Sequence, residues 1–427
     1  MKRIIMLAIC ALTVLTMHAQ EFEKYFTDKT LRADYMLSGD HATQHVALKE
    51  LGCFDGWAGR RHHLSQLPLT GNGQVAMRDK ATGKVIYRMS FSSLFQEWIG
   101  EEEARHMQKS FEHTVLLPYP KEPAVIEISL LTPRHTPAAV LRHTVDPSDI
   151  LIRPLKRIPA PMKQIMHGGD AKDMIDIVIM AEGYTADEAD LFYKDAEKAA
   201  SSIFSHAPFN KYKDRFNVTA LACPSQESGV SVPRKNEWKD TAVKSNFDTF
   251  YSARYLTTGS IWRIHDWLTG IPCEHIIILA NTDVYGGGGI YNSMTLTTAH
   301  HKDFWPVVTH EFGHSFGGLA DEYAYSDEPC PLYPYDIEPW EKNITTLADF
   351  SQKWEKMLPR GTKIPTKAET SEPDIYEKVG VYEGAGYTRH GIYRPATECR
   401  MKINEAPGFC PVCRAWLEEL IKFYTQK

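Results

Sequence analysis

The first third of the chain consists of short segments in which apolar and polar residues alternate. Residues 74–78 and 84–89 alternate on either side of a polar turn, which predicts a β-hairpin. Residues 125–130 and 139–144 show the same period of two. Strands with one buried face predict an antiparallel β-sandwich over residues 20–154.

The pattern changes after residue 173. Compact apolar runs at 175–180, 216–221 and 275–280 are typical of buried strands. Between the first two runs, a capping-box pattern at Thr185 opens a segment with helical spacing. Strands that alternate with helices predict an α/β domain over residues 174–427.

Two further segments complete the expected organisation. Residues 155–173 contain several Pro and Gly residues and are expected to form a linker, whereas residues 249–268 are expected to be helical. The predicted fold class is therefore α+β and multidomain, with an N-terminal antiparallel β-sandwich followed by an α/β domain.

A glycine-rich stretch at residues 285–292 precedes the most informative motif. It lacks the Lys-Ser or Lys-Thr of a phosphate-binding loop. Gly287, Gly288 and Gly289 would suit a flat edge strand against which an extended peptide could pair its backbone. A hairpin tip without a ligand is the alternative.

Composition and charge narrow the class of protein. Hydrophobic residues make up 43% and charged residues 24% of 427 residues, as in ordinary soluble domains. A net charge of -6 without a basic stripe argues against a nucleic-acid partner. Residues 1–19 combine a basic pair, an apolar run and a small-residue ending, which predicts a Sec signal peptide. We therefore expect export to the periplasm, the cell surface or the medium, with no integral membrane segment after signal removal.

Residues 310–323 read HEFGHSFGGLADEY and predict a zinc site. His310 and His314 are one helical turn apart, so both imidazoles can reach one metal ion, and Glu311 can act as general base on a zinc-activated water. The double glycine should end the helix and return the chain toward the metal. Either Asp321 or Glu322 would then supply the third ligand.

The C-terminal region adds candidates around this motif. Tyr387 and Tyr393 could donate a hydrogen bond to the oxyanion of the tetrahedral intermediate. Export favours disulfides, so we expect one or two bridges among the following cysteines, with unknown pairing: Cys330, Cys399, Cys410 and Cys413. A four-cysteine zinc knuckle is a weaker alternative, because the sequence contains a single CxxC.

Taken together, these motifs resemble the bacterial immunoglobulin-A peptidase family of zinc metallopeptidases, which is metzincin-like. The resemblance covers about residues 172–427, and the preceding part is similar to the β-sandwich domain of Bacteroides-type members. It implies one catalytic Zn²⁺ and these roles: zinc ligands His310, His314 and Asp321, general base Glu311, and Met401 in the Met-turn beneath the zinc. In the wider metzincin pattern the third ligand would fall at Ala320, so it must be displaced here, and the shorter Asp321 is preferred to Glu322.

The expected activity is that of an exported zinc-dependent endopeptidase acting on protein or peptide substrates. A zinc hydrolase of cell-wall peptides or amides would use the same residues. A non-catalytic surface protein that binds glycan or protein is the alternative from another class, although the intact HExxH motif argues against it.

Overall fold

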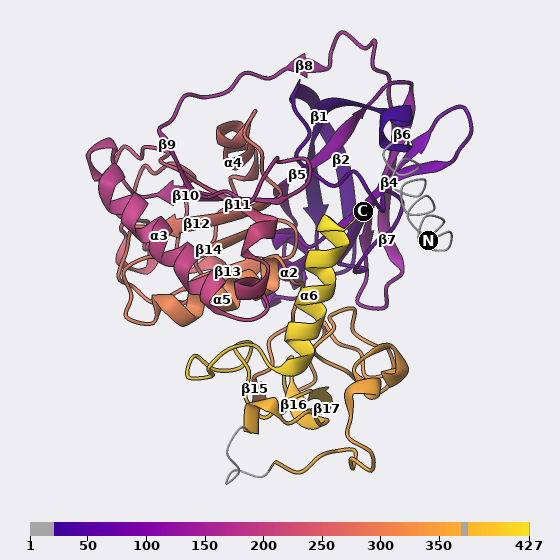
Figure 1. Cartoon of the computed structure of the whole chain (residues 1–427), viewed down its shortest axis with the longest axis vertical. Helices are drawn as coiled ribbons and strands as arrows, with labels where there is room; N and C mark the ends of the chain where they lie inside the picture. Colours follow the sequence, from indigo (N-terminus) through magenta and orange to yellow (C-terminus); the bar gives the residue numbers. More distant parts are fainter. Residues whose placement is uncertain (1–20, 369–374, 427) are drawn as a thin grey trace, which may run out of the picture.

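The computed structural model describes residues 21–368 and 375–426, so the expected signal peptide lies outside the described residues. Two β-sheets from the N-terminal third lie beside a larger α/β layer, and a small C-terminal sheet lies below both in Figure 1. Within the described residues, no helix is both long and apolar enough to span a bilayer.

The N-terminal domain is a sandwich of two four-stranded sheets. Side chains such as Leu31, Val75 and Ile126 from both sheets share one buried core, because alternate residues of each strand face inward. The predicted hairpin is present as β3 and β4. The sheets run β5-β1-β2-β8 and β4-β3-β6-β7, with these bounds: β1 Phe26–Gly39, β2 Gln44–Asp55, β3 Gly73–Asp79, β4 Val85–Phe91, β5 Lys109–Pro120, β6 Ala124–Leu131, β7 Pro137–Val145 and β8 Arg153–Pro154.

The α/β domain is built on a six-stranded sheet in the order β13-β14-β12-β10-β11-β9. Its four inner strands are parallel, and both edge strands are antiparallel to their neighbours. The bounds are β9 Met162–Met166, β10 Ile175–Glu182, β11 Phe216–Leu221, β12 His275–Ala280, β13 Gly287–Ile290 and β14 Met294–Thr298.

Helices cover both faces of this sheet, which explains why β10 is buried along its whole length. Ile177 and Ile179 face a core shared with α3, α5 and α6, whereas Val178 and Met180 face a core shared with α4. The bounds are α2 Leu94–Trp98, in the N-terminal domain, α3 Ala189–Ser205, α4 Ile261–Leu268, α5 Phe304–Ser315 and α6 Pro411–Thr425.

Two segments differ from expectation. Part of the expected linker forms β9, an edge strand that pairs with β11. The expected helix at 249–268 is helical as α4 only from Ile261, because the backbone at Phe250 and Tyr251 adopts positive φ. The expected capping box is present at Thr185 and Glu188.

A third, three-stranded sheet joins the segment that follows the HExxH motif to residues 382–394. Its order is β15-β17-β16, with bounds β15 Ala324–Ser326, β16 Tyr382–Ala385 and β17 Tyr387–Arg394. After it, α6 returns to the body of the molecule (Figure 1). Near its end, Phe423 stacks on His63 of the N-terminal domain, and Tyr424 contacts His275 of β12. The helix therefore contacts both domains.

Candidate metal centre

The two histidines of the motif lie on one face of α5, close to its C-terminal end. Phe312 and Val308 on another face are fully buried in the core shared with α3 and α6. The helix ends at Ser315 with Phe316 as its C-cap, and Gly318 adopts a φ of +56°, which turns the chain back. The buried face thus fixes the direction in which His310 and His314 point.

Three ligand atoms converge at this end of α5. The Nε2 atoms of His310 and His314 are 3.0 Å apart, and Asp321 Oδ1 lies 3.1 Å and 3.3 Å from them. Ligands of a tetrahedral zinc ion at about 2.0–2.1 Å are about 3.3–3.4 Å apart. Asp321 Oδ1 is buried and has no hydrogen-bond partner. These three side chains therefore fit a divalent metal ion of zinc size.

Backbone carbonyls fix the tautomer of both histidines. His310 Nδ1 donates to the carbonyl of Arg400 at 2.8 Å, and His314 Nδ1 donates to that of Leu319 at 2.6 Å. Because a carbonyl only accepts, the hydrogen is on Nδ1 and the lone pair of each neutral ring is on Nε2. Both lone pairs can therefore be directed at a shared metal.

Asp321 is oriented by a tyrosine from the C-terminal sheet. The Tyr387 hydroxyl donates to Asp321 Oδ2 at 2.7 Å, which leaves Oδ1 for the metal position. The Gly386 N–H also donates to the Asp321 carbonyl at 3.0 Å. The structure therefore places Tyr387 on a ligand. Tyr393 pairs through its backbone with Thr345 and with Glu383 of β16, and no described contact of it reaches the histidines.

The charges in the site are complementary. Burial lowers the pKa of both imidazoles, but the Asp321 carboxylate outweighs it and raises the pKa of His314 to about 9, so a metal ion would bind in place of the proton on Nε2. The same contacts lower the pKa of Asp321 in spite of its burial. This buried carboxylate requires nearby positive charge, which a divalent cation can supply.

Glu311 lies next to the first histidine. Burial raises the pKa of its carboxyl group, Asp321 raises it further, and the two imidazoles oppose the shift. A carboxylate with a raised pKa is a stronger proton acceptor near neutral pH. Its environment therefore suits a general base.

Met401 lies against the underside of α5. It is fully buried, and a Cβ added to Gly313 would lie 2.6 Å from its Sδ. Its carbonyl accepts from the Glu322 N–H at 2.8 Å. The thioether thus packs against α5 at Gly313, one residue before His314, and the Met-turn role stays a prediction.

The glycine stretch forms β13, the edge strand next to α5. A Cβ on Gly289 would lie 2.3 Å from the Glu311 carbonyl oxygen, so the absence of side chains permits this close packing. One end of the strand is covered, because Tyr255 bridges to Gly287 and the Gly287 N–H donates to Arg254. The expected edge is therefore only partly open.

Glu322 and the cysteines, the remaining candidates from the sequence, do not take part in the group formed by the two histidines and Asp321. Glu322 is buried with three of the four cysteines that we expected to form disulfides, away from the histidines. All seven described cysteines are free, so the expected bridges are absent. Three sulfur atoms surround a common point instead of pairing, and Cys330 lies outside the group.

Sequence reasoning missed an acidic side chain that the N-terminal domain brings to this site. Burial raises the pKa of Glu97, on α2, to about 7, and the Glu311 and Asp321 carboxylates contribute to the shift. The Tyr255 hydroxyl donates a hydrogen bond to Glu97. Nothing in the local sequence of α2 marks this placement, because it depends on how the two domains pack.

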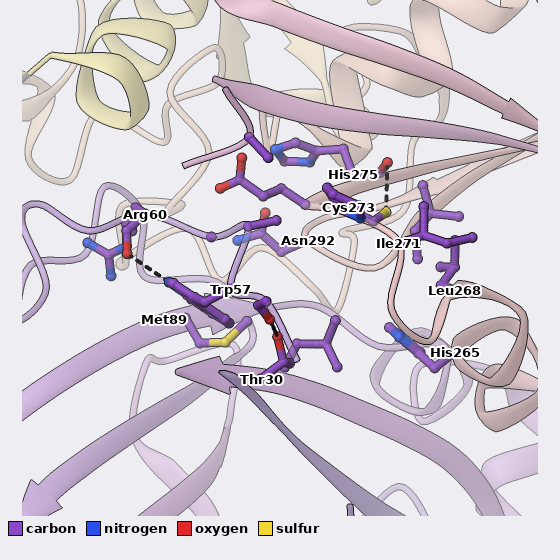
Figure 2. A pocket seen from close by; sticks show the side chains of 18 of the residues that line it. Thr30, Trp57, Arg60, Met89, His265, Leu268, Ile271, Cys273, His275 and Asn292 are labelled. Atoms are coloured by element: carbon purple, nitrogen blue, oxygen red, sulfur yellow. Dashed lines mark hydrogen bonds between the residues drawn. The ribbon is translucent and has the colours of Figure 1, made fainter. Parts of the chain in front are cut away.

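A cavity of about 500 Å³ lies between the two domains, apart from the metal centre. Figure 2 shows Trp57 and Met89 of the N-terminal domain and His275 and Ile271 of the α/β domain among its lining residues. Neither the histidines of the motif nor Asp321 line it. The chemistry of the motif therefore does not take place in this cavity.

Comparison with known proteins gives one clear result. The profile of the family described as IgA Peptidase M64 matches residues 164–375 and 367–421, and that of the Peptidase M64 N-terminus matches residues 21–141. No curated protein matches the chain. A metalloproteinase-II from Bacteroides fragilis matches among solved structures at 10% identity, over 59% of this chain and 84% of that chain. Its TM-score of 0.21 is too low to support an argument.

Proposed function

The chain belongs to the IgA peptidase M64 family, and on that premise we propose that it is an exported zinc-dependent endopeptidase. Membership makes it a metallopeptidase with protein or peptide substrates. The observation that carries the finer proposal is the convergence of His310, His314 and Asp321 beside Glu311. Three protein ligands and an adjacent base are the arrangement of a catalytic zinc site.

The side chains divide the chemistry among them. When bound, zinc supplies a Lewis acid that polarises the scissile carbonyl and acidifies a water molecule. Glu311 accepts the proton of the attacking water and delivers it to the leaving amine. Tyr387 holds Asp321 through its hydroxyl, so in this arrangement it positions a ligand instead of contacting the substrate.

The substrate backbone would pair with the uncovered part of β13. The Gly287 N–H points away from β14, toward Arg254, and strand residues alternate in direction with period two. Gly289 therefore presents its backbone groups on the same outer side, while one face of this residue lies against the helix turn that carries Glu311. An extended peptide paired there would lie across the metal centre, as an endopeptidase requires.

Export is the part of the proposal that depends on the sequence of residues 1–19 alone. A basic pair followed by an apolar run and a small-residue ending is the pattern of a Sec signal peptide. Fractionation of cells that express the full chain, with and without these residues, measures it directly. Retention of the full chain in the cytoplasm would refute export.

Replacement of the base tests the peptidase proposal. We expect Glu311→Ala to retain zinc, because Glu311 is not a ligand, and to lose about 100- to 10,000-fold in kcat on a mixed protein substrate. Glu328→Ala, at an exposed glutamate beyond the motif, is the matched control and should retain activity.

Each other outcome has a defined meaning. A wild-type protein that binds no zinc would overturn the proposal. Full activity of Glu311→Ala would reject Glu311 as the base. Zinc binding without cleavage of any protein would reject the endopeptidase, and cell-wall peptides and amides would then be tested as substrates.

A further inference from the structure

A second group of carboxylate and thiol side chains lies apart from the histidines of the metal centre. Glu322, Cys399, Cys410 and Cys413 are all fully buried, and one ligand atom from each lies within 4.8 Å of the others. Cys410 caps the N-terminus of α6, and Cys413 lies in its first turn. The group therefore joins three segments that are distant in the sequence.

The distances in this group suit a tetrahedral ion. Two thiolate sulfurs bound to zinc at about 2.3 Å lie about 3.8 Å apart, and the Cys399 and Cys413 sulfurs are 3.8 Å apart. Glu322 Oε1 lies 3.1 Å from the Cys413 sulfur. A carboxylate and three thiolates would complete four coordination positions, which is the closed arrangement of structural zinc sites.

The hydrogen bonds around the group support ligands and leave one atom without a partner. Asn343 donates to Glu322 Oε1 at 2.9 Å, and the Cys410 N–H donates to the Cys399 sulfur at 3.3 Å. Glu322 Oε2 is buried and has no hydrogen-bond partner. An unpaired buried carboxylate oxygen is costly, and a bound cation would remove that cost.

The position of Cys410 also favours a thiolate. It is the N-cap residue of the 15-residue α6, where the partial positive charge of the helix N-terminus stabilises an anion.

Cationic side chains surround the group. Arg394 and Lys402 interact electrostatically with Glu322, and Arg400 interacts with Cys399. Three thiolates, a carboxylate and a divalent ion carry a net charge of about -2, which these cations offset. The electrostatic surroundings therefore match an anionic metal complex.

A disulfide accounts for these observations less well. Three cysteines can form one bridge among themselves, which would leave the third thiol and the Glu322 carboxylate buried without a role. Disulfide sulfurs lie about 2.05 Å apart, and no described cysteine is paired in this way.

We propose that Glu322, Cys399, Cys410 and Cys413 bind a second, structural zinc ion that holds the catalytic site in place. Two short segments connect the sites. Asp321 belongs to the catalytic group and Glu322 to the second group, and Cys399 directly precedes Arg400, whose carbonyl holds His310. A metal ion bound to Glu322 and Cys399 would therefore hold their neighbours Asp321 and Arg400 in place. Asp321 is a proposed catalytic ligand, and the Arg400 carbonyl orients His310.

Metal counting on the full mature protein tests this proposal. We expect about two zinc ions per chain in the wild type and about one in His310→Ala. The variant should lose only the catalytic zinc ion, because His310 belongs only to the first group. Cys413→Ser should also lose one, whereas Cys330→Ser, a cysteine outside the group, should keep both. A wild type with about one zinc ion, all of it lost in His310→Ala, would overturn the proposal.

A second measurement detects thiolate ligation in the wild-type protein itself, so its main result does not depend on how well a variant folds. Cobalt(II) exchanged into wild-type protein and into His310→Ala should give a sulfur-to-cobalt charge-transfer band in both, because thiolates ligate only in the second group. The band persists even if the peptidase proposal fails, so the two proposals are tested separately. Absence of the band would overturn the proposal. A mass for the denatured, unreduced chain that is lower by two hydrogen atoms would show that a disulfide has formed instead of the metal site.

Discussion

Tyr387 links Asp321, a proposed zinc ligand, to the C-terminal sheet through its hydroxyl group. Its backbone has a φ of +71°, a conformation that costs a residue with a side chain about 1 kcal/mol or more. In this conformation the phenol reaches Asp321. The strain at Tyr387 is thus associated with the orientation of the third ligand.

Removing that hydroxyl should weaken metal binding without removing a ligand. We expect Tyr387→Phe to bind zinc about 10- to 100-fold more weakly, because Asp321 loses the partner that orients it. Competition with a chromogenic chelator measures the affinity. Tyr393→Phe, at a tyrosine without a described contact to the site, is the control, and equal losses in both variants would contradict the assigned role.

Single residues also show what local spacing can predict. The i, i+4 spacing is sufficient to place His310 and His314 on one face of a helix. Neither the Glu97 contact nor the destination of Glu322 is local, because each depends on a segment that is distant in the sequence. The choice between Asp321 and Glu322 required the path of the chain after Gly318.

At the scale of elements, α5 packs directly on β13. Gly289 is where the approach is closest, since an added Cβ would lie 2.3 Å from the Glu311 carbonyl oxygen and 2.9 Å from His314 Cβ. Both contacts involve the helix turn that carries the base and the second histidine. Because Gly289 has no side chain, β13 and α5 can pack at this short distance.

Adding that side chain should separate the two elements. We expect Gly289→Ala to lower the free energy of unfolding by about 1–3 kcal/mol, because backbone atoms of α5 cannot move aside as a flexible side chain can. Denaturant titration measures the change. Gly259→Ala, where an added Cβ meets nothing within 4 Å, is the control. Equal stability of the two variants would show that α5 and β13 have room to adjust.

The limits of prediction at this scale have physical causes. Strands β10, β11 and β12 were predictable because both faces are buried, which leaves continuous apolar runs. The helical pattern at 249–268 fails before Ile261 because tertiary contacts hold residues there at positive φ. Strand β9 is short and mostly exposed, so its sequence resembles a linker.

At the scale of the whole molecule, Arg32 connects the two domains. It is almost fully buried on β1 and donates to Asp34 at 2.9 Å within its own domain. It also donates to Asp266 at 2.6 Å and to the Trp262 carbonyl at 3.0 Å, both on α4. One guanidinium group thus neutralises a buried carboxylate and holds a helix of the other domain.

Loss of this charge should destabilise the molecule strongly. We expect Arg32→Met to cost about 3–5 kcal/mol, because the buried Asp34 loses its cation. Thermal unfolding followed by circular dichroism measures the shift. Arg142→Met, which breaks an ion pair whose arginine is 70% exposed, should cost less than about 1 kcal/mol. If both variants melt together, the Arg32 contact contributes no more than a surface pair.

The segment from Cys399 to Met401 is synthesised well after the HExxH helix against which it packs. A growing chain acquires the HExxH helix well before the residues that hold His310 in orientation and pack beneath the helix. Until that later segment has been synthesised and folded, the histidines have neither the Arg400 carbonyl nor the Met401 thioether as support. We therefore expect the metal centre to be complete only after the segment that carries Arg400 and Met401 has been synthesised and folded.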